Sequence, residues 1–188
     1  MSLVIDKIKC VEESDEVGSD DIYLIVFQGR TVPPFSSGLN SVGPGSAWGD
    51  FDTGETHGND VRVASTNADG MYAVMMVEKD NQKDISGDEV VGAWRAQTDL
   101  IWKSIMLSLV ASGQSTSSES AKSSAFTGMK NALNGLASLY MDFPKGNDDV
   151  IKVRRVTIAA SGSSQILRFR SDEEDATYDV TFKQTSAA

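Results

Sequence analysis

Residues 22–29, "IYLIVFQG", are the stretch that decides the fold. β-Branched and aromatic side chains occupy both alternating faces of this segment. A strand with one polar face is half-buried, whereas a strand that is apolar on both faces is covered on both sides. A second such segment, "MYAVMMVEKD", spans residues 71–80. The two segments therefore predict strands at the centre of a β protein.

Outward from this centre, shorter segments with strand character occupy residues 3–10, 61–65 and 90–94. Residues 30–60 are rich in Gly, Ser and Pro and have no helical period. They predict a long ordered loop with short strand pieces. A loop of this length in a compact domain is either functional or contains a missed element.

The pattern becomes helical after residue 94. Ile101, Ile105 and Leu109 recur every four residues, which predicts an amphipathic helix over residues 95–110. Thr116 and Glu119 fit a capping box, and apolar residues follow at helical spacing until the region of residue 143. The short connection predicts an antiparallel helical pair. Its apolar faces are expected to pack on the neighbouring sheet; the alternative is a detachable amphipathic hairpin that engages a partner or a membrane.

Strands return in the last part of the chain, within residues 150–160, 165–171 and 176–184, and "SDEED" at 171–175 predicts the hairpin turn between the last two. Strands first, two helices next and strands last favour an antiparallel arrangement over βαβ units. We therefore expect a mainly β protein: one domain, 1–188, folded as an antiparallel β-sandwich with an inserted antiparallel helical pair at about 95–143.

The chain of 188 residues has a formal net charge of −10 and a pI of about 4.5. This charge disfavours nucleic-acid binding and unaided binding to anionic membranes. One cysteine, Cys10, excludes an internal disulfide. The first ten residues lack the pattern of a signal peptide, and the apolar run 100–111 is too short to span a bilayer, so we expect a soluble protein that is cytoplasmic at synthesis.

Two acidic segments stand out, residues 10–21 and 78–89. The first carries Glu12, Glu13, Asp15, Glu16, Asp20 and Asp21 without a base. Clustered carboxylates repel one another by roughly 1 kcal/mol per close pair in water, and a divalent cation removes that cost. Ca²⁺ takes six to eight oxygen ligands, more than one such loop supplies. Two loops at one end of a sandwich could supply them, although acidic runs at strand ends are more often solvated turns.

"DEVGSDDIYLIV", residues 15–26, resembles the first calcium loop of C2 domains, and "MMVEKDNQKDISGDEVVGAW", residues 75–94, resembles a later loop of that family. The resemblance covers about half of the chain. It implies a C2-like fold, a Ca²⁺ cofactor and ligands from both loops. The implied ligands are Asp15 and Asp20 from the first loop, and Glu78, Asp80 and Asp84 or Asp88 from the second.

The chain also departs from the C2 pattern. Asp21-Ile22 stands where the family has one proline, and Glu78 stands where it has a shorter aspartate. The long 30–60 segment and the helical pair are not parts of an ordinary C2 domain. The longer side chain of Glu78 is expected to shift the position of the ion.

Other candidate sites are weaker. His57 lies among several acids, but one histidine without a nucleophile is more typical of an ordinary loop residue. The sequence has no Gly-x-Ser-x-Gly elbow and no Walker-type loop, so enzyme activity is not expected. Trp48 and Phe51 could stack on a sugar or insert at a membrane interface, but they are expected to pack in the side of the sandwich.

The leading hypothesis is a non-enzymatic, calcium-binding C2-like module that interacts, in a calcium-dependent way, with a protein partner or a calcium-bridged membrane surface. One alternative is a structural or assembly subunit that forms homo-oligomers through its helical insertion. Another is a carbohydrate-binding sandwich that uses Trp48.

Overall fold

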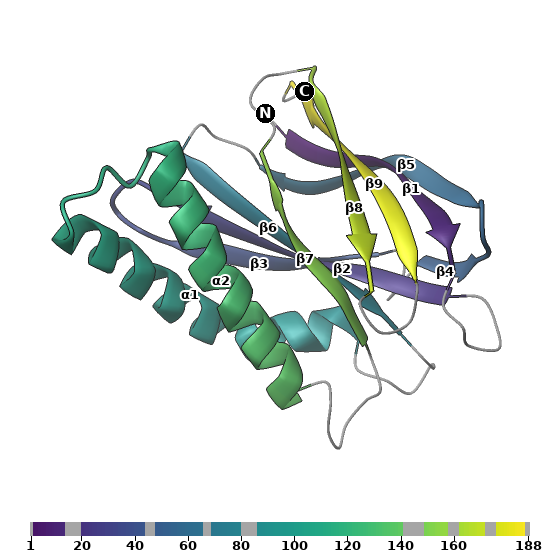
Figure 1. Cartoon of the computed structure of the whole chain (residues 1–188), viewed down its shortest axis with the longest axis horizontal. Coiled ribbons are helices and arrows are strands. Elements are labelled where there is room, and N and C mark those ends of the chain that lie inside the picture. The colour runs from purple at the N-terminus through teal and green to yellow at the C-terminus, as the bar shows by residue number, and fades with distance from the viewer. Residues whose placement is uncertain are drawn as a thin grey trace.

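The described part of the chain folds into two antiparallel β-sheets and a layer of two helices (Figure 1). The structure is a computed structural model and describes residues 2–13, 20–43, 48–65, 69–79, 86–140, 149–157, 162–171 and 176–186. The first sheet has the order β5-β1-β9-β8. The second has the order β3-β2-β6-β7, and β4 also pairs with β2. The strands are β1 (Ser2–Glu12), β2 (Asp20–Arg30), β3 (Ser37–Val42), β4 (Trp48–Phe51), β5 (Thr56–Ser65), β6 (Gly70–Glu78), β7 (Asp149–Val156), β8 (Ser164–Arg170) and β9 (Thr177–Thr185).

The predicted antiparallel sandwich with a helical insertion is therefore confirmed. The two strands that the sequence marks as apolar on both faces, β2 and β6, lie side by side in the second sheet. Ile22, Leu24 and Val26 face the first sheet, whereas Tyr23, Ile25 and Phe27 face the helices. All six side chains have no exposed surface. The molecule thus contains two apolar cores, one on each face of the second sheet.

The helix α1 (Gly87–Ala111) begins eight residues before its predicted start. The prediction that residues 90–94 form a strand is wrong. Ser86 and Glu89 form a capping box, in which the Ser86 side chain accepts a hydrogen bond from the Glu89 N–H and the Glu89 carboxylate accepts one from the Ser86 N–H. Val90, Val91 and Trp94 then continue the buried stripe of the helix.

The helix α2 (Glu119–Tyr140) returns alongside α1 in roughly the opposite direction (Figure 1), as the short connection predicts. Its cap is Ser118, whose Oγ accepts a hydrogen bond from the Ala121 N–H at 3.2 Å. The predicted capping box of Thr116 and Glu119 is therefore wrong. Both helices pack their apolar faces on the second sheet, as expected for the helical pair.

Residues 30–60 contain more strand than the sequence predicts. β3 and β4 lie in this segment, and β5 begins at Thr56. β3 has only two buried apolar residues, Leu39 and Val42. It is held by pairing with β2 and by hydrogen bonds from Ser37 and Ser41 to carboxylates of α1. A strand of Ser, Gly and Asn has little periodicity of its own, so the sequence pattern does not reveal it.

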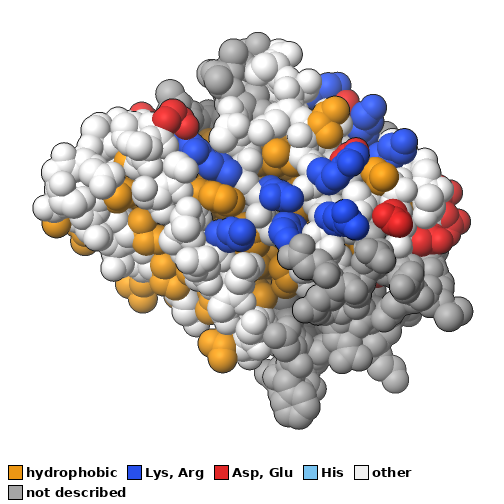
Figure 2. Space-filling model, in the orientation of Figure 1, with side chains coloured by type: hydrophobic (Ala, Val, Ile, Leu, Met, Phe, Trp, Pro, Cys, Tyr) orange, Lys and Arg blue, Asp and Glu red, His pale blue; other side chains and the backbone are white. Residues whose placement is uncertain are grey.

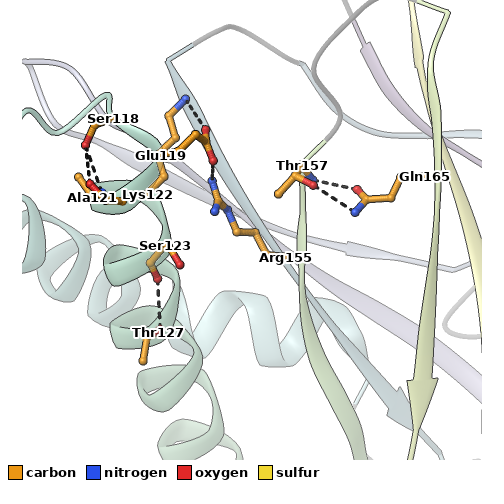
Figure 3. A network of polar contacts seen from close by, with 10 residues as sticks. Ser118, Glu119, Ala121, Lys122, Ser123, Thr127, Arg155, Thr157 and Gln165 are labelled. Carbon is orange, nitrogen blue, oxygen red and sulfur yellow. Dashed lines mark hydrogen bonds and ion pairs between the residues drawn. The ribbon is translucent and has the colours of Figure 1, made fainter.

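At one side of the sandwich, β7 and β8 connect the two sheets. Arg154 Nε donates to the Arg168 carbonyl at 2.9 Å. The Thr157 N–H donates to Gln165 Oε1 at 2.9 Å, and Gln165 Nε2 donates to Thr157 Oγ1 at 3.2 Å (Figure 3). Each of these strands is at the edge of its own sheet, so the polar contacts join the two edges.

Candidate functional site

One end of the sandwich collects strand termini that lead into acidic segments. In the second sheet, Ile22 lies opposite Glu78, and Glu78 lies opposite Asp149. The Lys79 N–H donates to the Asp21 carbonyl at 2.7 Å, which ties the end of β6 to the start of β2. The start of β2, the end of β6 and the start of β7 therefore lie together.

The first sheet contributes its own strand termini to the same end. Thr177, at the start of β9, lies opposite both Glu12 of β1 and Arg170 of β8. The link to the second sheet comes from Glu13 and Thr53, because each backbone N–H donates to the other's side chain at 3.2 Å. Thr53 lies two residues after the end of β4, which pairs with the start of β2. We call this region, marked by Glu12, Asp21, Glu78, Asp149 and Thr177, the acidic end.

Four segments outside the described residues begin or finish at the acidic end. They are 14–19, 80–85, 141–148 and 172–175, and their sequences hold two, two, two and four acids respectively. The sequence pairs the acidic segments 10–21 and 78–89, which contain the first two, and predicts a charged hairpin turn at 171–175 that could lie at the same end. This prediction missed 141–148, although the acids of "GNDD" directly before a strand were a visible signal.

Four of the six predicted metal ligands have side chains outside the described residues. Asp15, Asp80 and Asp84 lie outside the described residues, and Asp20 is the first residue of β2, with a side chain that is also outside them. These assignments remain predictions.

The two predicted ligands with described side chains, Glu78 and Asp88, lie apart. Glu78 ends β6 and is only 3% exposed, so neighbouring groups enclose its carboxylate. Asp88 is exposed in the first turn of α1 and accepts a hydrogen bond from Ser41 of β3. Ser41 lies opposite Ile25, on the other side of β2 from β6. Within the ranges that the structure describes, no three His, Cys, Asp or Glu residues are close enough to hold a metal ion.

Glu89 also comes from the second acidic segment, but it belongs to the cap of α1. Hydrogen bonds from the backbone and the hydroxyl of Ser86 lower the pKa of the Glu89 carboxyl, and the nearby positive charge of Lys79 lowers it further. The carboxylate is therefore stabilised in its charged form by the start of the helix. The Glu89 carboxylate therefore has a structural role in the cap of α1 and is not an additional candidate metal ligand.

The other candidate site residues, Trp48, Phe51 and His57, pack against neighbouring side chains. Trp48 is 7% exposed and Phe51 is fully buried, which confirms that they pack in the sandwich. His57 Nε2 lies 3.7 Å from Glu55 Oε2, and its ring is 4.3 Å from the ring of Phe51. Trp48 is thus not an exposed platform for a sugar ring.

A basic face lies over β7 and β8 and contrasts with the net negative charge (Figure 2). These strands carry Lys152, Arg154, Arg155, Arg168 and Arg170. Arg168 forms two hydrogen bonds with Asp179, at 2.7 and 2.8 Å, and this contact lowers the pKa of the Asp179 carboxyl. Arg155 pairs with Glu119 of α2 at 2.9 Å (Figure 3). The negative net charge of the chain does not predict this basic face, although the segments "KVRR" and "RFR" indicate it in the sequence.

Comparison of the chain with protein-family models, with curated proteins and with solved structures finds no match. No helix among the described residues is long and apolar enough to cross a membrane.

Proposed function

We propose that the protein is a non-enzymatic, C2-like binding module whose acidic end binds Ca²⁺. The observation that supports this proposal is the strand register, which brings the starts of β2 and β7 and the ends of β1 and β6 to one end of the sandwich. The first two acidic segments, 14–19 and 80–85, are thereby anchored at neighbouring strands rather than at opposite ends of the molecule.

Electrostatics favours a cation at the acidic end. Neighbouring strands lie about 4.8 Å apart, so the strand ends from which these acidic segments extend lie at close range. At a separation of about 4 Å, two like charges repel by about 1 kcal/mol in water and by more where solvent is excluded. A divalent cation converts this repulsion into attraction, and carboxylate oxygens are the ligands that Ca²⁺ prefers.

The described residues do not form a complete metal site by themselves, because no three of their candidate ligands lie together. Calcium binding in this proposal therefore depends on Asp15, Asp20, Asp80 and Asp84, with Glu78 at the base of the acidic end. Bound Ca²⁺ would neutralise this end and leave coordination positions for an acidic group of a protein partner or a lipid headgroup.

A calorimetric titration of the full chain with Ca²⁺, and with Mg²⁺ for comparison, tests the proposal. We expect heat of binding and a rise in the melting temperature with Ca²⁺, and a loss of both in the double variant Asp15→Asn/Asp20→Asn. Asp69→Asn is the matched control, because Asp69 precedes β6 at the opposite end of the second sheet. No heat and no change in melting temperature at millimolar Ca²⁺ would disprove calcium binding.

A further inference from the structure

The outer face of the helical layer, turned away from the second sheet, is unlike the rest of the molecule. The buried stripes of α1 and α2 point to the sheet and form the second core. On the opposite side of α1, the side chains of Leu100, Leu107 and Val110 are 67%, 60% and 51% exposed. In a helix, positions seven apart lie on the same face, so Leu100 and Leu107 belong to one stripe. Figure 2 shows apolar side chains along the helical side of the molecule.

The helical layer is also neutral in a strongly acidic chain. Residues 86–140 contain four acids and four bases, so the whole net charge of −10 comes from the rest of the sequence. Lys103 pairs with Asp99 at 2.5 Å, and Glu119 pairs with Arg155 at 2.9 Å. After Glu119, the exposed residues of α2 carry no charge, and most of them are small and polar. Leu139, which is 81% exposed, adds an apolar side chain. The small exposed residues are Ser120, Ser123, Ser124, Thr127, Asn131, Asn134, Gly135 and Ser138.

We infer that this outer face binds a second copy of the same chain, with the helical layers of the two copies packed into a four-helix bundle. Two molecules of charge −10 repel each other over most of their surfaces. The helical layer carries no net charge, so two copies can approach there without that penalty and bury exposed leucines. Small side chains on α2 allow close packing of helices, whose axes lie about 8–10 Å apart in such contacts.

The size of the face fits a stable dimer. At 1.5 Å per residue, α1 and α2 are roughly 37 and 33 Å long, and two adjacent helices form a layer about 20 Å wide. The face therefore covers on the order of 700 Å², close to the ~800 Å² per partner of a standard interface. A membrane fits this face less well, because surface-bound helices use exposed Trp or Phe and Lys or Arg. Here Trp94 and Trp102 are buried.

Sedimentation equilibrium of the full chain tests the inference directly. The chain mass is 20.2 kDa, so a dimer has a mass of about 40 kDa. We expect the dimer mass for the wild type and the monomer mass for Leu107→Glu, with unchanged near-UV circular dichroism because Leu107 is exposed. Leu107→Ser removes the apolar contact without adding charge, and we expect its dimer dissociation constant to rise about tenfold or more.

Ile166→Glu is the matched control, because Ile166 is 64% exposed on β8, away from the helices. We expect this variant to remain a dimer. A wild type that stays monomeric at about 100 µM, well above the Kd range of a standard interface, overturns the inference. A Leu107→Glu variant that still dimerises, or an Ile166→Glu variant that does not, also overturns it, because the interface then lies elsewhere.

Two further measurements separate this inference from the proposed calcium site. We expect the same dimer mass in EDTA and in Ca²⁺, since the helical layer is distinct from the acidic end; a dimer that forms only with Ca²⁺ contradicts the inference. Flotation with phosphatidylcholine–phosphatidylserine vesicles in EDTA should leave the protein unbound. Vesicle binding that Leu107→Glu abolishes would assign the face to membranes instead of to a second copy.

Discussion

At the scale of single residues, the contact between Trp102 and Gly29 fixes α1 on the sheet. The Trp102 indole occupies the space beside Gly29, so a Cβ added at residue 29 would lie 2.4 Å from Trp102 Cε2. Trp102 Nε1 also donates a hydrogen bond to the Arg30 carbonyl at 3.0 Å. Glycine at this position of β2 thus lets the indole reach both the strand backbone and the second core.

Replacement of Gly29 by alanine tests this contact. We expect Gly29→Ala to lower the free energy of unfolding by about 2–3 kcal/mol, because Trp102 must shift from a well-packed position. Gly38→Ala is the control, since a Cβ at Gly38 of β3 meets nothing within 4 Å. Urea denaturation of both variants gives the comparison. Equal midpoints would show that the contact does not constrain the helix.

At the scale of elements, the start of α1 is set by its capping box. The sequence "SGDE" places Ser86 three residues before Glu89, which is the spacing of a capping box, yet the valines that follow favour a strand by composition. The segment is helical because its buried side chains recur at helical spacing. They are Val90, Val91, Trp94 and Thr98. Packing on the sheet therefore prevails over local β propensity.

We expect Ser86→Ala to destabilise the protein by about 1 kcal/mol, because the N–H of Glu89 loses its acceptor at the helix start. Ser104→Ala is the comparison, and its expected effect on stability is opposite in sign or close to zero. Ser104 is exposed in the middle of α1, where alanine is the better helix former, so its replacement should be neutral or slightly stabilising. Thermal unfolding followed at 222 nm measures both changes. A Ser86→Ala variant as stable as Ser104→Ala would contradict the role of the cap.

The two capping patterns show what the sequence predicts about elements and what it leaves open. Thr116 and Glu119 have the right spacing for a capping box, but Glu119 instead pairs with Arg155 of β7, 36 residues away. Ser118 takes the role of the cap. Local spacing identifies the region where a helix starts. The residue that caps the helix also depends on long-range ion pairs, which a local sequence pattern does not contain.

At the scale of the whole molecule, the strand-helix-strand order of the sequence was sufficient to predict the sandwich and its helical insertion. The sheet order was not predictable, because it depends on which strands pair across long separations. For the same reason, sequence reasoning linked only two of the four acidic segments at the acidic end. The segments at 141–148 and 172–175 reach that end through β7, β8 and β9, whose places in the sheets come from the structure.

The contacts between the two sheet edges make a prediction at this scale. We expect Gln165→Ala to lower the free energy of unfolding by about 1 kcal/mol, because the hydrogen bonds between Gln165 and Thr157 are lost. Amide hydrogen exchange should become faster in β7 and β8 than in β1 and β5. Gln97→Ala, on the exposed surface of α1, is the control. Unchanged exchange in β7 and β8 would show that the sheets are held together by their apolar core alone.

The position of β2 and β6 between the two cores has a consequence for cooperativity. Alternate side chains of one strand belong to different cores, so neither core can open without disturbing a backbone that the other needs. The sandwich consequently depends on the helical layer for its stability, because loss of the helices would expose the middle of the second sheet to water. Sandwich and helices should melt as one thermodynamic unit, whatever ligand or partner each of their surfaces serves.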